Sequence, residues 1–138
     1  MKITLIMLLC LTSCSTSNIT NLQRCTVSRV IDGDTFVCDD MTVRLAGIDA
    51  PELDEHHGQE SYDMLKEMID DRVLWIDVTG IGYYGRTIAY SDIDWIDIGK
   101  YLLVNGHARH IKYKHKYSDN YSKFERMAKR HQKGIWAY

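Results

Sequence analysis

Carboxylates and arginines gather in three short segments of this sequence. The segments are residues 32–34 (Asp-Gly-Asp), residues 44–52 (Arg-Leu-Ala-Gly-Ile-Asp-Ala-Pro-Glu) and residues 84–86 (Tyr-Gly-Arg). Taken singly, each is what a tight turn with solvated charges would show, because Asp and Gly are ordinary turn residues. Acidic residues and two arginines together, at turns and strand ends, form a more specific set. The set predicts a site that handles phosphate.

Oxygen ligands for a hard cation are available in the first two segments. Asp34 and Asp49 supply carboxylate oxygens. A backbone carbonyl near Ala50 and several waters could complete the roughly six to eight oxygens that Ca²⁺ accepts. Few protein charges on the metal imply weak affinity, which suits a compartment where calcium is abundant. The pattern therefore predicts a calcium site.

The other charged residues of the set fit attack of water on a phosphate. Glu52 follows Pro51, has no evident packing role, and could activate water as a general base. Arg44 lies in the middle of a predicted strand and so needs an anionic partner. Arg86 follows a glycine that lets the backbone approach closely. Both guanidinium groups could grip a phosphate and stabilise charge that develops on its oxygens.

Strands and helices must position these groups. Alternation of apolar residues and turn signals predict strands at residues 25–31, 35–38, 41–48, 73–78 and 87–90. Helical spacing predicts helices that begin at residues 58–61, 97 and 119. The expected fold class is α+β, mainly β: a five-stranded OB-fold barrel with about three helices. Trp75, Trp136 and Phe36 are the predicted large core residues.

The amino-terminal residues are typical of an export signal. Lys2 precedes an apolar run, residues 3–11, that is too short for a stable membrane anchor and matches a secretory signal. The run ends in Leu-Thr-Ser before Cys14, which resembles a bacterial lipobox. Alternatives are an ordinary cleaved signal or a buried strand. The predicted divisions are a lipoprotein-type signal peptide at 1–13, lipidation of Cys14, a tether at 14–23 and one domain at 24–138.

These features predict an exported protein. The lipid would anchor it to the bacterial cell envelope, on the periplasmic or extracellular face. Cys25 and Cys38 flank the first turn, so a hairpin would bring them near each other. A disulfide is then expected in an oxidising compartment, with two small buried thiols as the alternative.

Composition and charge limit the remaining possibilities. The 138 residues are 26% charged and 45% hydrophobic, and no run of about 18 apolar residues exists, which excludes a multi-span membrane protein. The net charge of −2 hides an asymmetry, because residues 1–104 carry −9 and residues 105–138 carry +7. Residues 112–117 (Lys-Tyr-Lys-His-Lys-Tyr) interleave basic and aromatic side chains. They favour binding of single-stranded nucleic acid over a merely solvated loop.

Together these motifs resemble the staphylococcal nuclease (thermonuclease) family. The resemblance runs from about Arg24 to Tyr138. The family is an OB-fold barrel with three helices that hydrolyses DNA and RNA with Ca²⁺ and leaves 3′-phosphates. The segments that carry the resemblance are residues 30–35 (Val-Ile-Asp-Gly-Asp-Thr), 43–52, 58–61 (Gly-Gln-Glu-Ser), 84–86 and 133–136 (Lys-Gly-Ile-Trp).

The resemblance implies a role for each acidic residue. Asp34, Asp49 and the Ala50 carbonyl would ligate calcium. Asp32 would order the waters of the metal. Glu52 would position or deprotonate the attacking water.

It likewise implies the residues that contact the substrate. Arg44 and Arg86 would contact the phosphate, and a tyrosine would stack on the nucleotide. Tyr113 and Tyr84 are the candidates for stacking. The sequence departs from the family pattern before residues 84–86, where Gly-Tyr stands in place of the usual Asp-Lys.

The function expected from this reading is calcium-dependent, sugar-nonspecific cleavage of DNA and RNA. Its partners would be nucleic acid, preferably single-stranded, and a membrane through the lipid anchor, and the protein would be a monomer. One alternative is an OB-fold lipoprotein that binds nucleic acid or a protein without cutting. Another is a surface lipoprotein in which calcium only stabilises the barrel.

Overall fold

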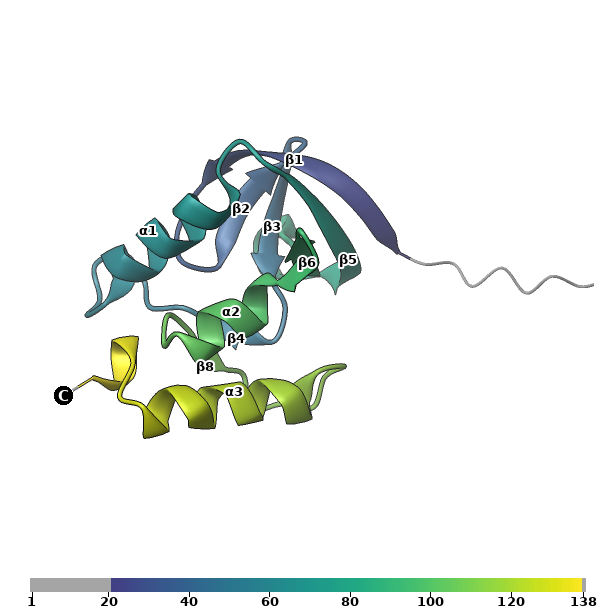
Figure 1. Cartoon of the computed structure of the whole chain (residues 1–138). Coiled ribbons are helices and arrows are strands. Elements are labelled where there is room, and N and C mark those ends of the chain that lie inside the picture. Colours follow the sequence, from purple (N-terminus) through teal and green to yellow (C-terminus); the bar gives the residue numbers. More distant parts are fainter. Residues whose placement is uncertain (1–20, 138) are drawn as a thin grey trace, which may run out of the picture.

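The computed structural model describes residues 21–137. The predicted signal peptide, Cys14 and most of the predicted tether lie outside these residues. Five strands form a closed barrel in the order β3-β2-β1-β5-β6, which the parallel pairing of β3 with β6 closes (Figure 1). These strands are β1 (Leu22–Val30), β2 (Thr35–Cys38), β3 (Met41–Leu45), β5 (Val73–Ile81) and β6 (Thr87–Ile93).

Three helices accompany the barrel, which confirms the predicted fold class. Helix α1 (Gly58–Ile69) is inserted between β4 (Ile48–Asp49) and β5. Helix α2 (Ile98–Val104) lies between the barrel and α3 (Ser118–Arg130), as Figure 1 shows. The remaining elements are short: β7 (Ile96–Asp97), β8 (Arg109–His110) and two 3₁₀ turns, η1 (Tyr83–Gly85) and η2 (Gly134–Trp136). No helix within residues 21–137 is both long and apolar enough to cross a membrane.

The turn between β1 and β2 is pressed against the rest of the molecule. The Ile31 N–H donates to the Thr35 carbonyl at 2.8 Å, which closes the turn. A Cβ atom at Gly33 would lie 2.7 Å from the Cβ of Ala50 and 2.8 Å from that of Ser61. Glycine is therefore needed here, because the turn touches both the segment after β4 and helix α1.

A disulfide joins β1 to β2. Cys25 and Cys38 are bonded, and their Cα atoms lie 5.5 Å apart. Val27 is the residue directly opposite Cys38, so the cross-link runs diagonally on one face of the hairpin. Both cysteines are buried.

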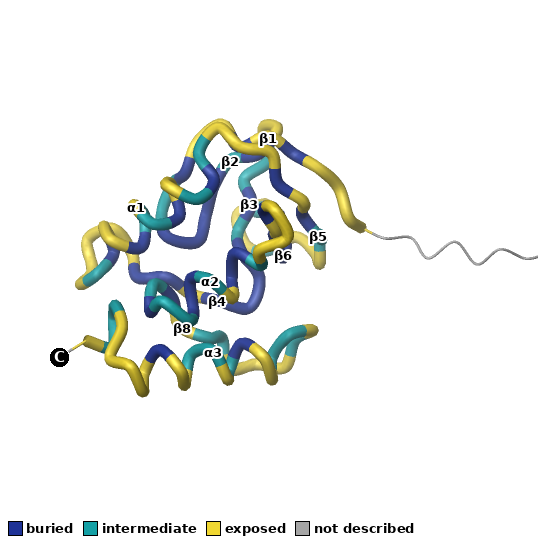
Figure 2. Tube along the Cα trace, viewed as in Figure 1, coloured by how far each residue is buried: buried dark blue, intermediate teal, exposed yellow. Residues whose placement is uncertain are grey.

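The core fills the inside of the barrel and the space beneath the helices. Figure 2 shows the buried residues as dark blue segments along the strands and on the inner sides of α1 and α2. Phe36 is fully buried, as predicted. The prediction for Trp75 was wrong: it is 41% exposed, because Leu74 and Ile76 take the inward positions on β5 and alternation turns Trp75 outward. Trp136 is only half-buried.

Candidate active site

The Asp34 carboxylate is the most deeply buried group of the candidate site. Only 5% of the residue is exposed. Its Oδ1 accepts a hydrogen bond from the Thr35 hydroxyl at 2.9 Å, and its Oδ2 accepts one from the Ala50 N–H at 2.9 Å. Burial raises the pKa of Asp34 to about 6, although the Arg44 guanidinium and the Ala50 N–H oppose the rise. Added positive charge near this carboxylate would stabilise its ionised form.

Arg44 draws two carboxylates together. Its Nη2 lies 3.2 Å from Oδ2 of Asp34 and 2.7 Å from Oδ1 of Asp49. Its Nη1 donates to the carbonyls of Leu45 and Ile48 at 3.2 and 3.0 Å. The anionic partner expected of an arginine in mid-sheet is thus a pair of aspartates. Arg44 ties β3 to β4 as well as carrying charge into the site.

The same geometry tests whether calcium fits. The Asp34 and Asp49 oxygens lie within 5.9 Å of each other, the sum of their distances from Nη2 of Arg44. Calcium binds oxygens at about 2.3–2.6 Å, so two ligands on opposite sides of the ion are about 5 Å apart. The donors are hard oxygens, and the Ala50 carbonyl belongs to the adjacent backbone. These residues fit calcium. In residues 21–137 no three His, Cys, Asp or Glu side chains form a complete metal cage, so water would supply the other ligands.

Glu52 belongs to the same acidic cluster. Its side chain is exposed, on the segment that follows β4 and Pro51. Partial loss of hydration raises the pKa of Glu52, and the negative charges of Asp32 and Asp49 raise it further. A carboxylate with a raised pKa is a better proton acceptor in its ionised form. The Asp32 carboxylate in turn accepts the Asp34 N–H at 3.0 Å, so it also shapes the turn.

Arg86 lies directly before β6, on the face of the sheet that carries Arg44. The parallel pairing of β3 with β6 places Ile88 opposite Arg44. Arg86 lies two residues before Ile88 in extended backbone, so its side chain is on the same face as that of Arg44. Its Nε donates to the Tyr83 carbonyl at 3.4 Å. Within the described part of the chain, no carboxylate lies within 4.0 Å of this guanidinium, which leaves it able to take an anion.

The two candidate stacking tyrosines lie on different loops. Tyr84 is 97% exposed in η1, beside Arg86, and has a φ of 61°. Tyr113 is 58% exposed in residues 111–117, which we call the basic loop. The basic loop follows β8, and Arg109 of β8 pairs with Asp49 of β4. Tyr113 and the lysines of the basic loop border a hollow of about 580 Å³.

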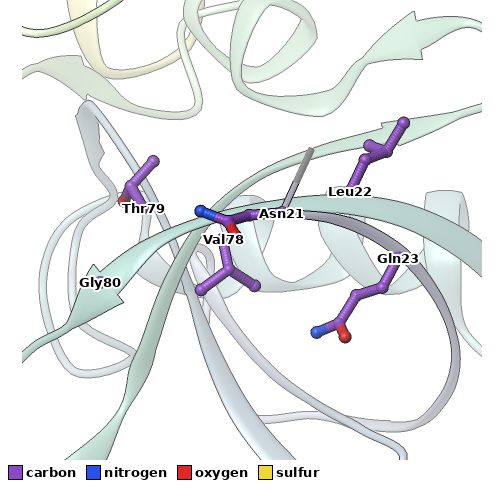
Figure 3. A pocket seen from close by; sticks show the side chains of 6 residues that line it. All are labelled: Asn21, Leu22, Gln23, Val78, Thr79 and Gly80. Atoms are coloured by element: carbon purple, nitrogen blue, oxygen red, sulfur yellow. The ribbon is translucent and has the colours of Figure 1, made fainter. Parts of the chain in front are cut away.

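Another hollow carries no comparable chemistry. It has a volume of about 480 Å³ and lies where the start of β1 meets the end of β5 (Figure 3). Its lining has no carboxylate, imidazole, thiol or basic side chain. The lining residues are Asn21, Leu22, Gln23, Val78, Thr79 and Gly80. This hollow is therefore not a candidate active site.

Comparison with known families identifies the family of this chain. Residues 42–138 match the family described as staphylococcal nuclease homologue. This chain belongs to the staphylococcal nuclease family. The matched residues include Arg44, Asp49, Glu52 and Arg86, and the contacts of Asp34 with Arg44 and Ala50 join the preceding hairpin to them.

Individual relatives come from bacteria and a plant. The thermonuclease of Staphylococcus hyicus is 30% identical over 131 residues, covering 85% of this chain and 78% of that protein. A probable staphylococcal-like nuclease of Oryza sativa subsp. japonica is 36% identical over 96 residues, 70% of this chain but 19% of its own length. An uncharacterized endonuclease of Haemophilus influenzae is 29% identical over 118 residues, covering 82% of this chain and 66% of that protein. The chain thus spans about a fifth of that plant relative.

Sequence reasoning missed two residues that border the cluster. Arg109 is the neighbour of Asp49 across the β4–β8 pair, and its guanidinium lies 5.6 Å from the ring centre of Trp136. Glu55 contacts the backbone of Glu52. The pairing of two-residue strands has no sequence signal that could have revealed Arg109. The Glu-x-x-Glu spacing of residues 52–55 did carry a signal, since side chains three apart cap turns.

Proposed function

We propose that this protein is a calcium-dependent endonuclease that cleaves DNA and RNA without regard to the sugar. The observation that carries the proposal is the convergence of Asp34 and Asp49 on Arg44, with Glu52 in the same acidic cluster. Membership of the staphylococcal nuclease family supports it. Contacts to phosphate and stacking on bases, rather than contacts to base edges, would explain low sequence specificity.

Each residue then has a chemical task. Glu52 accepts a proton from water as the water oxygen bonds to phosphorus. The bond from phosphorus to the 5′ oxygen breaks, which leaves a 3′-phosphate and a 5′-hydroxyl that takes its proton from solvent. Arg86 and Arg44 stabilise the charge on the phosphate oxygens. Calcium, when held by Asp34, Asp49 and the Ala50 carbonyl, would supply further positive charge beside those oxygens.

The basic loop and Tyr84 are the proposed substrate-binding parts. Lys112 and Lys114 would attract the phosphate backbone. Tyr113 or Tyr84 would stack on a base, since both rings are exposed. This arrangement favours single strands, whose bases are available for stacking.

We also propose that the protein acts outside the cytoplasm, as a monomer anchored through a lipid on Cys14. The apolar run at residues 3–11 and the residues before Cys14 support export and lipidation. The Cys25–Cys38 disulfide is consistent with an oxidising compartment.

The experiment is cleavage of single-stranded DNA and of RNA by the purified protein in Ca²⁺, in Mg²⁺ and in chelator. We expect cleavage of both substrates in Ca²⁺, 3′-phosphate ends, and no cleavage in chelator. Absence of cleavage in Ca²⁺ would contradict the proposal. Salt-sensitive binding without cleavage would instead support a binding protein. Calcium-dependent melting with neither binding nor cleavage would support a purely structural role for the metal.

A further inference from the structure

The backbone of Glu52 is held by a neighbouring carboxylate. Its N–H donates to Oε2 of Glu55 at 2.9 Å. Its carbonyl accepts the N–H of Glu55, also at 2.9 Å. Two hydrogen bonds thus join the residues, and the bond from the Glu55 side chain to the Glu52 N–H is the one that a Glu makes in a capping box. Both backbone groups of Glu52 are engaged, although its own side chain is exposed to solvent.

Fixed points on either side of the pair limit its movement. On one side, the Ala50 N–H is bonded to the buried Asp34, and Pro51 restricts φ between Ala50 and Glu52. On the other side, the Gly58 N–H donates to the Glu55 carbonyl at 3.0 Å. A Cβ atom at Gly58 would collide with the carbonyl of Glu52. Glycine at the start of α1 therefore lets the helix close the turn directly against Glu52.

Glu55 belongs to the acidic cluster around Glu52. Asp32, Asp49 and Glu52 already place negative charge there, and Glu55 adds to the charges that act on Glu52. Its side chain nevertheless holds the Glu52 N–H. The neighbouring Asp54 makes no side-chain hydrogen bond within residues 21–137, although it has the same charge and is also exposed.

We propose that Glu55 is a positioning residue for the general base Glu52. It fixes the backbone from which the Glu52 side chain reaches the attacking water. The proposal rests on the proposed function, because it assigns Glu55 to the step that Glu52 carries out. Substrate and calcium binding would not depend on Glu55.

The kinetic test compares Glu55→Ala with Glu55→Gln and with Asp54→Ala as the matched control. We expect Glu55→Ala to lower kcat about 3- to 10-fold with KM unchanged, since a misplaced base weakens only the chemical step. Glu55→Gln keeps an acceptor oxygen and should stay within about twofold of the wild type, as should Asp54→Ala. In a Glu52→Gln background, Glu55→Ala should cause no further loss. The proposal would be overturned if Glu55→Ala lowered kcat as much in the Glu52→Gln background as in the wild type. It would also be overturned if Asp54→Ala lowered kcat as much as Glu55→Ala.

A second readout does not depend on activity. Hydrogen exchange of the Glu52 N–H in the protein without substrate should be slowed in the wild type and in Glu55→Gln, and at least about 10-fold faster in Glu55→Ala. Equal exchange in all three proteins would overturn the assignment of Glu55. Failure of the wild type to cleave nucleic acid would instead count against the proposed function, so the two failures are distinguishable.

Discussion

Arg44 and Arg86 carry the same charge in different surroundings. Arg44 is bonded to Asp34, Asp49 and two backbone carbonyls. Arg86 has one long hydrogen bond, to the Tyr83 carbonyl. The first residue is therefore part of the folded framework as well as the candidate site, whereas the second has few contacts within the fold and is proposed to contact substrate.

Substitution should separate these two roles. Arg44→Ala leaves the buried Asp34 carboxylate without its ion pair and should lower the free energy of unfolding by about 3 kcal/mol. Arg86→Ala should change it by less than about 0.5 kcal/mol. Both should lower cleavage about 100-fold or more, because each removes charge from the transition state. Urea unfolding and cleavage rates are the measurements. Equal unfolding free energies would contradict the framework role of Arg44.

At the scale of residues, the sequence predicted the types of group but not all their contacts. Asp34, Asp49 and Glu52 could be selected because they occur together with two arginines at turns and strand ends. The double contact of Arg44 could not be predicted, because it depends on how β4 returns toward β3. The reciprocal bonds between Glu52 and Glu55 depend in the same way on how closely α1 approaches the turn.

Among the elements, the basic loop is anchored by one histidine. The Tyr90 hydroxyl lies 2.8 Å from Nδ1 of His115, and the Tyr117 N–H donates to the same nitrogen at 3.3 Å. A backbone N–H can only donate, so Nδ1 must accept and the neutral ring carries its proton on Nε2. That nitrogen lies 3.0 Å from Nε2 of His110. The hydrogen bonds that hold the basic loop therefore require a neutral His115.

This anchor should weaken in acid. Burial and the nearby His110 lower the pKa of His115 in the folded protein. The unfolded chain therefore binds a proton on His115 more readily than the folded protein does. The contribution of neutral His115 to the free energy of unfolding is complete above about pH 6.5 and is lost as the pH falls below that value. Between pH 7.5 and 5, the free energy of unfolding measured in urea should fall less for His115→Gln than for the wild type. His131→Gln, at an exposed position after α3, is the control and should behave as the wild type. Identical pH dependence in His115→Gln would contradict this account.

Element lengths show where sequence patterns stop being informative. The predicted strand at 35–38 matches β2. The predicted strand at 41–48 is divided in the structure, because β3 ends at Leu45 and β4 begins at Ile48. Strand β5 extends beyond the predicted 78 because its pairing with β6 continues across a bulge between Val78 and Gly80. Strand β6 extends beyond the predicted 90 because its last residues pair with the first half of β5 and with β7. Two-residue strands such as β4 and β8 contain no period to detect, so their pairing was missed.

For the whole molecule, the uneven charge should govern binding of nucleic acid. Lys112 and Lys114 extend from the basic loop, whereas Lys116 is held 2.8 Å from Asp77. Replacing both Lys112 and Lys114 by Gln should reduce the slope of log K against log salt for single-stranded DNA by about 1.4, roughly 0.7 for each lost phosphate contact. Lys66→Gln, on the exposed side of α1, is the control and should leave the slope unchanged. An unchanged slope in the double variant would remove the basic loop from the binding surface.

The central claim is that Glu52 performs the chemistry in a site that other residues build. Its most direct test is Glu52→Gln, which keeps the shape of the side chain but cannot take a proton. We expect calcium-dependent cleavage of single-stranded DNA to fall about 100- to 10,000-fold, while DNA binding and the free energy of unfolding stay at wild-type values. Cleavage at the wild-type rate by the folded variant would contradict the account.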